Sequence, residues 1–404
     1  MQISPDGHLC YCTNIHPGES WPEVLASLKT TLAVRDKFSP NRRFGIGLRL
    51  SAQAAAQLGT GEQLIAFRDW LADHNCYVFT MNGFPYGGFH GKVVKDEVHR
   101  PDWKTAGRLQ YTKLLFEQLA LLLPAGMDGG VSTSPVSYRH WFKDQDKIDR
   151  VLKRGAQQMG QVVVQLIQLR RDTGKTLHLD IEPEPDGLLN DTTDFLAFYD
   201  DYLLIHAAQV VARQLGVTQE LAQDHVRSHL RLCYDICHAS VSYEDQEGLL
   251  RELREREIRV GKLQISAALK APLTDLTQRK RVRAALRPYH ESTYLHQTVF
   301  RNGRGNTHQC ADLDEGLDLL VRPEYRELRT HFHVPIFTNG YGVLQSTNDD
   351  IRKVLAHWKE RPFTPHLEVE TYTWDVLPDQ SQLSLADSIH RELTWVIDQL
   401  APTD

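Results

Sequence analysis

The chain alternates short apolar runs with longer segments of helical periodicity, and this alternation constrains its fold more than any other feature. A strand, a helix and a second strand form the unit from which parallel sheets are built. Eight apolar runs are interpreted as strands, at residues 9–14, 44–50, 77–82, 130–134, 177–182, 232–235, 262–266 and 367–372. Eight such units favour an α/β fold, the (β/α)8 or TIM barrel.

Helical patterns separate these runs. The first predicted helix, residues 21–34, follows Ser20 as N-cap and carries Pro22 in its first turn, where the missing N–H costs little. Further helices are predicted at residues 62–74, 105–123, 147–170, 194–215, 244–255 and 384–400.

The chain has 404 residues, whereas a bare barrel needs about 250. We therefore expect insertions after strands three and seven. Residues 83–102 are rich in glycine and aromatic residues, and residues 270–330 are interpreted as helix, hairpin and helix, with Asn302-Gly303 as the hairpin turn. Residues 331–337 also resemble a strand, which we assign to the second insertion. No repeat or linker is visible, so one domain over residues 1–404 is expected.

Composition narrows the function classes. The formal net charge is −6, and no basic stripe suggests nucleic-acid binding. The sequence contains no run of eighteen apolar residues, so no membrane-spanning helix is predicted. The first residues show no pattern of a secretory signal. The six cysteines are interpreted as buried free thiols in a reducing compartment. We expect a cytoplasmic protein with a small-molecule substrate, and leave open self-association into a homo-oligomer.

Acidic and histidine residues fall at the ends of successive predicted strands, where a (β/α)8 barrel carries its active site. Glu182 ends the fifth strand, Asp235 and His238 follow the sixth as Asp-x-x-His, and Glu370 lies in the eighth. Carboxylates with imidazole suit zinc, manganese or iron. Glu184, next to Glu182, is equally well explained as part of an acidic, solvated loop.

Two further segments place polar side chains on one strand face by alternation. Lys262, Gln264 and Ser266 share a face of strand seven and contact either a metal or substrate, or simply fill the barrel. His331 and His333 also share a face, and paired imidazoles are common metal ligands, with His333 preferred.

Candidates for the substrate side lie in loops and at strand ends. The glycines and aromatic residues after strand three suit a lid over a pocket. A packed loop residue explains each candidate at least as well. The candidates are His16, Asn82, His90, Arg139, His140, Lys262 and Trp374.

The order of Glu182, the Asp235–His238 motif, a polar strand seven, a histidine segment and Glu370 resembles the xylose-isomerase-like superfamily. That superfamily includes sugar isomerases, ketose 3-epimerases and endonuclease IV. The resemblance implies metal binding by the three carboxylates and one histidine, and proton transfer by Glu182 and Glu370. Gln264 stands where the epimerases usually have histidine, so either its amide oxygen binds the metal or His333 does.

Four segments resemble the EboE family, called metabolite traffic protein EboE. They are CTNIHPGESW (12–21), NGFPYGGFHG (82–91), DIEPEPD (180–186) and VETYTWDVLP (369–378). The resemblance implies a bacterial gene cluster that also encodes a prenyltransferase-like membrane protein and is linked to export or processing of a secondary metabolite. It implies no particular reaction.

The predicted function is a divalent-metal-dependent isomerase or epimerase of a sugar, a sugar phosphate or a cyclitol. A metal would act as Lewis acid on adjacent substrate oxygens, while Glu182 and Glu370 remove and return a proton and His238 assists. Two alternatives stay open: a metal-dependent phosphoesterase of the endonuclease IV kind, and a non-catalytic carrier of a metabolite.

Overall fold

A computed structural model describes residues 1–401 apart from positions 6, 40, 89, 91, 92, 375, 376 and 378–383. Parts of two predicted motifs therefore lie outside the described residues, namely positions 89 and 91 of NGFPYGGFHG and positions 375, 376 and 378 of VETYTWDVLP. In the described part, no helix is both long and apolar enough to span a membrane.

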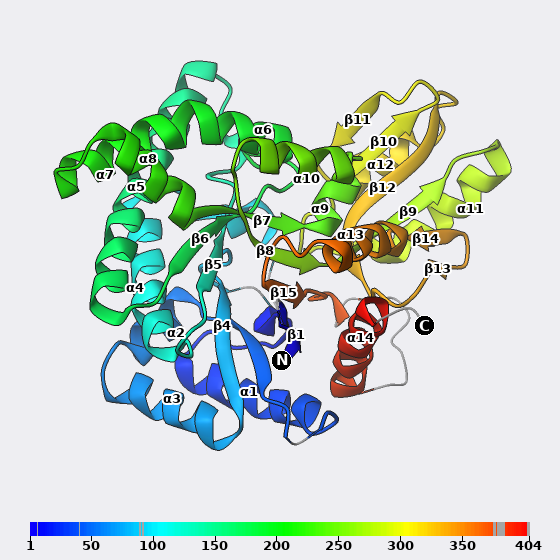
Figure 1. Ribbon diagram of the computed structural model, residues 1–404. Helices are drawn as coiled ribbons and strands as arrows, with labels where there is room; N and C mark the ends of the chain where they lie inside the picture. Colours follow the sequence, from blue (N-terminus) through cyan, green and yellow to red (C-terminus); the bar gives the residue numbers. More distant parts are fainter. Residues whose placement is uncertain are drawn as a thin grey trace.

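Eight parallel strands form the barrel (Figure 1). They are β2 (Gly7–Tyr11), β3 (Phe44–Arg49), β4 (Cys76–Asn82), β5 (Gly129–Thr133), β6 (Leu177–Ile181), β7 (Leu230–Asp235), β8 (Val260–Ile265) and β15 (His366–Val369). They pair in the order β2-β15-β8-β7-β6-β5-β4-β3, and a parallel bridge between Cys12 and Gly47 joins the two ends. All eight predicted strands and the predicted barrel are thus confirmed.

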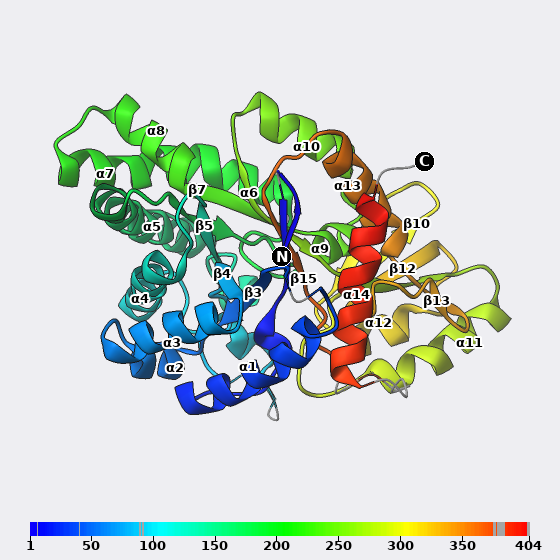
Figure 2. The same ribbon diagram turned by 60° about the horizontal axis from the view of Figure 1, so that its bottom comes forward.

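Helices surround the barrel, as Figure 2 shows from a second direction. They are α1 (Trp21–Arg35), α2 (Ala52–Leu58), α3 (Glu62–Asp73), α4 (Ala106–Leu122), α5 (Gln145–Thr173), α6 (Thr192–Phe198), α7 (Ala208–Leu215), α8 (Gln219–His229), α9 (Ile236–Val241), α10 (Gln246–Glu255), α13 (Asn348–Glu360) and α14 (Leu385–Leu400). Helix α1 begins with the predicted cap, a capping box in which the Glu23 carboxylate accepts from the Ser20 N–H at 2.9 Å.

The second insertion forms a sheet of its own, to the right of the barrel in Figure 1. Its antiparallel order is β11-β10-β12-β9-β14-β13. The strands are β9 (Ala267–Pro272), β10 (Thr298–Asn302), β11 (Thr307–Cys310), β12 (Tyr325–Val334), β13 (Gly340–Tyr341) and β14 (Leu344–Ser346), with helices α11 (Leu276–Leu286) and α12 (Leu313–Leu319) between them. The hairpin after Asn302 is confirmed, and residues 331–334 belong to β12 in this sheet. The prediction missed β9, which pairs with β12.

The first insertion, residues 83–102, is a long loop whose only helical part among its described residues is the 3-10 turn η2 (Lys95–His99). Both predicted insertions therefore lie where the sequence places them.

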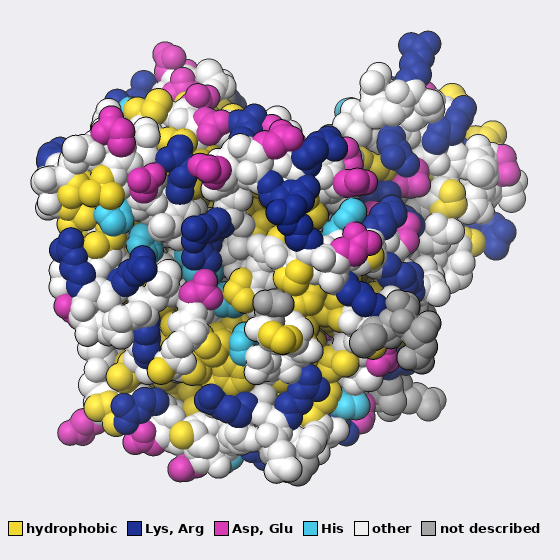
Figure 3. All heavy atoms as spheres, viewed as in Figure 1, with side chains coloured by type: hydrophobic (Ala, Val, Ile, Leu, Met, Phe, Trp, Pro, Cys, Tyr) yellow, Lys and Arg dark blue, Asp and Glu magenta, His cyan; other side chains and the backbone are white. Residues whose placement is uncertain are grey.

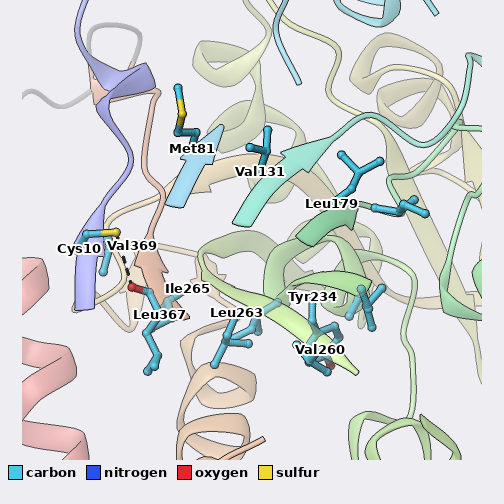
Figure 4. Packing of buried hydrophobic residues seen from close by; sticks show 14 of the residues in the cluster. Cys10, Met81, Val131, Leu179, Tyr234, Val260, Leu263, Ile265, Leu367 and Val369 are labelled. Carbon is cyan, nitrogen blue, oxygen red and sulfur yellow. Dashed lines mark hydrogen bonds between the residues drawn. The ribbon is translucent and has the colours of Figure 1, made fainter. Parts of the chain in front are cut away.

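Strand alternation gives the barrel wall two different faces. Apolar side chains such as Met81, Val131, Leu179, Leu263 and Leu367 are fully buried in the main hydrophobic core (Figure 4). The residues between them turn polar groups into the interior.

Lys262 and Glu368 form an ion pair inside the barrel, since unpaired buried charge is costly. Lys262 Nζ lies 2.7 Å from Glu368 Oε1 and donates to Ser132 Oγ at 3.0 Å. A Cβ at Gly47 would clash with the Glu368 carboxylate, so glycine leaves room for this ion pair. Side chains nearer the carboxyl ends of the strands then form the site.

Candidate functional site

A cavity of about 60 Å³ lies at the carboxyl ends of the barrel strands. Its polar wall consists of Asn14, Asn82, Glu182, Glu184, His238, His331, His333 and Glu370. Its remaining wall, largely apolar, comes from both insertions and the segment after β15: Phe84, Pro85, Val94, Lys95, Val98, Tyr294, Leu295 and Tyr372. The structure therefore brings together six of the residues singled out from sequence.

Three buried carboxylates converge on the side-chain amide of Gln264. Its Nε2 lies 3.0 Å from Glu182 Oε1, 2.9 Å from Asp235 Oδ2 and 2.7 Å from Glu370 Oε2. An amide nitrogen carries two hydrogens and can give full hydrogen bonds to two of these oxygens at once. The third carboxylate needs a proton or a cation.

Other groups fix the orientation of these carboxylates. Asn14 and Asn82 both donate to Glu370 Oε1, at 2.7 and 3.1 Å. Ser266 Oγ donates to Asp235 Oδ1 at 2.6 Å, and the Cys237 backbone N–H donates to the same oxygen at 2.7 Å as α9 begins. These neutral donors hold the acidic groups in place without cancelling their charge.

Burial and mutual repulsion change how these acids titrate. Burial raises the pKa of Glu182 well above its ordinary value, and the charge of Asp235 adds to the effect. Burial raises the pKa of Glu370 in the same way, with Glu182 contributing. Burial also acts to raise the pKa of Asp235, but His238 and His333 outweigh it and lower that pKa. A divalent cation would replace the protons that the two glutamates otherwise retain.

Three histidines are held in matching orientations. Each donates Nδ1–H to a fixed oxygen: His238 to Pro183 O at 2.9 Å, His331 to Gln297 Oε1 at 2.8 Å, and His333 to Glu370 O at 2.8 Å. In the neutral tautomer that these bonds select, each Nε2 carries the free lone pair.

The Nε2 atoms of His331 and His333 lie only 3.3 Å apart. Burial lowers the pKa of His333 to about 4 and that of His331 well below its ordinary value, which favours the neutral form of the rings. Two ring nitrogens that face each other at this distance share either a proton or a metal ion. Oxygen or amide acceptors on the second ring nitrogen are the usual support of metal-binding histidines.

The donor set fits a divalent metal. Among the described residues, ligand atoms lie within 4.8 Å of one another in four groups at this site, of which three hold no cysteine: Glu182, Asp235 and Glu370; Asp235, His238 and His333; and Glu184, His238 and His331. The fourth is Cys237, His331 and His333. The first offers only carboxylate oxygen, which magnesium and manganese prefer, and the others add imidazole, which suits zinc and iron.

Two predicted substrate-side residues lie next to the cavity. Lys262 lies beneath the carboxylates, paired with Glu368, and does not line the cavity. His90 Nε2 donates to Asn14 O at 2.6 Å, and its Nδ1 lies 3.4 Å from the Tyr294 hydroxyl, so it joins two residues of the wall.

The other four predicted substrate-side residues do not line the cavity. His16 is hydrogen-bonded to the Tyr11 hydroxyl at 2.8 Å and borders a separate hollow. Arg139 pairs with Asp194, and the half-exposed His140 Nε2 lies 3.0 Å from Asp186 Oδ1. The half-buried Trp374 follows Thr373 outside the lining set.

Several residues of the site were not chosen from sequence as ligands or substrate contacts. Asn14 ends the first predicted strand as Glu182 ends the fifth, and Ser266 ends the seventh, so both carried the strand-end signal. Gln297 and Tyr294 carry no such signal, because they reach the site only through the packing of the second insertion on the barrel.

No family model matches the chain, and no curated protein matches it in sequence. Several solved structures resemble its fold at low sequence identity. A D-allulose 3-epimerase from Methylomonas sp. gives a TM-score of 0.49 at 11% identity, covering 99% of this chain and 100% of that one. A xylose isomerase-like TIM barrel protein from Mycobacterium smegmatis, in complex with magnesium, gives 0.45 at 14%, with coverage of 99% and 100%. The IOLI protein with a zinc atom gives 0.45 at 13%, covering 97% of each chain.

Proposed function

We propose that this chain is a divalent-metal-dependent isomerase or epimerase of a sugar, a sugar phosphate or a cyclitol, formed by one domain over residues 1–404. The observation that supports it best is the placement of Glu182 and Glu370 on either side of Gln264. Both are buried, and burial raises the pKa of both, so both carboxylates hold a proton more readily than free glutamate does. Removing a proton from one face of a carbon and returning one to the opposite face, as in epimerisation, uses two such groups.

Glu182, Asp235 and Glu370 would hold the metal, with His238 and His333 as neighbouring ligands. The metal supplies Lewis-acid polarisation of adjacent substrate oxygens when it is bound. With a metal bound, Gln264 would either turn its amide oxygen toward the site or keep donating to the carboxylates. Cys233 Sγ donates to Gln264 Oε1 at 3.0 Å, and this bond favours the second orientation.

Glu182 or Glu370 would remove a proton from the carbon next to the substrate carbonyl, and the other would return one. Asn14 and Asn82 keep Glu370 Oε1 occupied, so its Oε2 is the oxygen directed toward Gln264 and the centre of the cluster. Of the predicted substrate-side residues, Asn82 donates to Glu370, and His90 donates to the backbone of Asn14. The remaining walls exclude water from the intermediate.

We also propose membership of the EboE family, on the four sequence segments given above. Their residues belong to this site: Asn14, Asn82, Glu182, Glu184 and Glu370 all fall within them. Membership would make the substrate an intermediate or precursor of a secondary metabolite.

Solvent exchange tests the proposed reaction. The metal-loaded protein is incubated in D₂O with a panel of ketoses, aldoses, cyclitols and their phosphates, and NMR follows deuterium at carbon. Incorporation by the wild type that is lost in Glu370→Gln but kept in Glu244→Gln, a half-buried carboxylate outside the site whose pKa burial also raises, would support the proposal. Equal incorporation in both variants would refute the role of Glu370.

Metal-dependent phosphoester hydrolysis is the second candidate, and the histidine lone pairs favour it. The group of Glu184, His238 and His331 offers a ligand set separate from the three carboxylates. Two or three bound zinc ions and hydrolysis of bis(p-nitrophenyl) phosphate, without solvent exchange, would favour this candidate. Binding of metabolites without either activity would favour a carrier.

A further inference from the structure

A second cluster of ligand-type side chains lies at the opposite end of the barrel. Asp128 precedes β5, His178 lies in β6, and His366 begins β15. One nitrogen or oxygen of each lies within 4.8 Å of the others. His178 and Glu182 are four residues apart along β6, or about 13 Å at the usual rise of a strand. The cluster is therefore separate from the site described above.

His178 turns an unsatisfied nitrogen toward this cluster. Its Nδ1 donates to Asp180 Oδ1 at 2.6 Å, which leaves the lone pair on Nε2. That Nε2 lies 3.7 Å from Asp128 Oδ2 and has no hydrogen-bond partner within the described chain, although the side chain is fully buried. A lone pair and a carboxylate oxygen that face each other repel unless a proton or a metal ion lies between them.

His366 completes the arrangement. Its Nε2 lies 3.4 Å from Asp128 Oδ1 and donates to the Asp128 carbonyl oxygen at 3.2 Å, a bond that a metal ion on this nitrogen would replace. The ring is held between that of His178, with centroids 5.2 Å apart, and that of Phe79, at 5.1 Å. Arg231 also donates to Asp128 Oδ2, at 3.0 Å. A carboxylate has about four acceptor positions, so this bond leaves room for a metal on the same group.

The fold makes space for the histidine and its supporting carboxylate. A Cβ at Gly130 or at Gly261 would clash with Asp180 and would crowd His178. Gly130 lies in β5 and Gly261 in β8, so both strands carry glycine beside the pair of His178 and Asp180. A carboxylate on the second nitrogen of an imidazole is the usual support of a zinc-binding histidine.

The cluster is reachable from solvent. Asp128 is about a quarter exposed and lines a cavity of about 640 Å³, together with Arg231, Arg254, Arg259 and Arg361. Figure 3 shows Lys and Arg side chains gathered near the middle of the face in view, around the place of β7, β8 and α10. The Asp128 carboxylate is therefore accessible from this cavity, whose guanidinium groups oppose the approach of a cation.

We propose that Asp128, His178 and His366 form a second metal site, at the amino-terminal end of the barrel, that takes zinc or a similar transition-metal ion. Two imidazoles and one carboxylate with an open position match the donors that such ions prefer. The ion would link the starts of β5, β6 and β15, and so tie the two halves of the barrel together.

Zinc-soaked crystals of the wild-type protein test this placement, with anomalous diffraction recorded on both sides of the zinc absorption edge. The expected result is an anomalous peak among Asp128, His178 and His366. No peak there at millimolar zinc would overturn the proposal.

Zinc stoichiometry in solution gives a second test that does not depend on the reaction. Asp128→Asn should lose one equivalent of zinc relative to the wild type, and Glu247→Gln, which changes an acid lining the same cavity, should lose none. Glu370→Gln should keep the zinc held by Asp128, His178 and His366. Loss of metal at the carboxyl ends of the strands can therefore be distinguished from loss of metal at this cluster. Equal zinc content in Asp128→Asn and the wild type would refute the proposal.

Discussion

The buried pair of Lys262 and Glu368 allows a quantitative test of how the polar interior is stabilised. Both side chains are fully buried and lie 2.7 Å apart. Lys262→Met leaves the carboxylate without its cation, and breaking a buried pair in this way costs about 3–5 kcal/mol. Unfolding entropy is about 2.1 cal/mol/K per residue, or about 0.85 kcal/mol/K for 404 residues, so the melting temperature should fall by about 4–6 °C.

The double variant Lys262→Met/Glu368→Leu provides the control, because replacing both partners by apolar groups is often neutral. Calorimetry or circular dichroism would compare the wild type, both single variants and the double variant. We expect the double variant to recover most of the loss. A loss below about 1 °C in Lys262→Met, or a double variant that loses the sum of the single effects, would refute the reasoning.

Three further predictions concern other parts of the barrel. Gly47→Ala should cost about 1–3 kcal/mol in thermal unfolding, because its Cβ would clash with the carboxylate beneath it, whereas Gly61→Ala meets no atom within 4 Å and should be near neutral. Burial raises the pKa of Glu392 to about 8, so its contribution to stability is present below about pH 4 and is lost as the pH rises through 8. The melting temperature of Glu392→Gln should therefore rise relative to that of the wild type as the pH increases from 6 to 9. A difference that stays constant over this range would contradict the reasoning. Gln297→Leu removes the acceptor that orients His331 and should weaken zinc binding by about 10–100-fold in a chelator competition, while an unchanged affinity would argue against a ligand role.

Much of the fold followed from periodicity. Runs such as residues 177–182 are apolar on one face and bounded by helical segments, and a parallel barrel strand is the structure that satisfies both constraints. Strand β9 was missed because it follows β8 with a single residue between them, so the two read as one apolar stretch. Helix α9 is a short segment of six residues and carries too little periodicity to be recognised.

The site could be predicted in part for a similar reason. Residues at strand ends, such as Glu182 and Asp235, are located by the fold class alone, since carboxyl ends of barrel strands meet at one edge. Loop residues such as Arg139 and His140 follow strands too, but they pair with Asp194 and Asp186 outside the cavity. Contacts made by the second insertion depend on tertiary packing, which no local pattern specifies.

Metal content tests the central claim most directly. The purified protein is stripped with a chelator, supplied in turn with manganese, iron and zinc, and analysed for bound metal beside Glu370→Gln and the matched variant Glu244→Gln. Binding at the carboxyl ends of the strands predicts at least one equivalent in the wild type and in Glu244→Gln, and one equivalent less in Glu370→Gln. Equal metal content in all three proteins would contradict the assignment of these carboxylates as ligands.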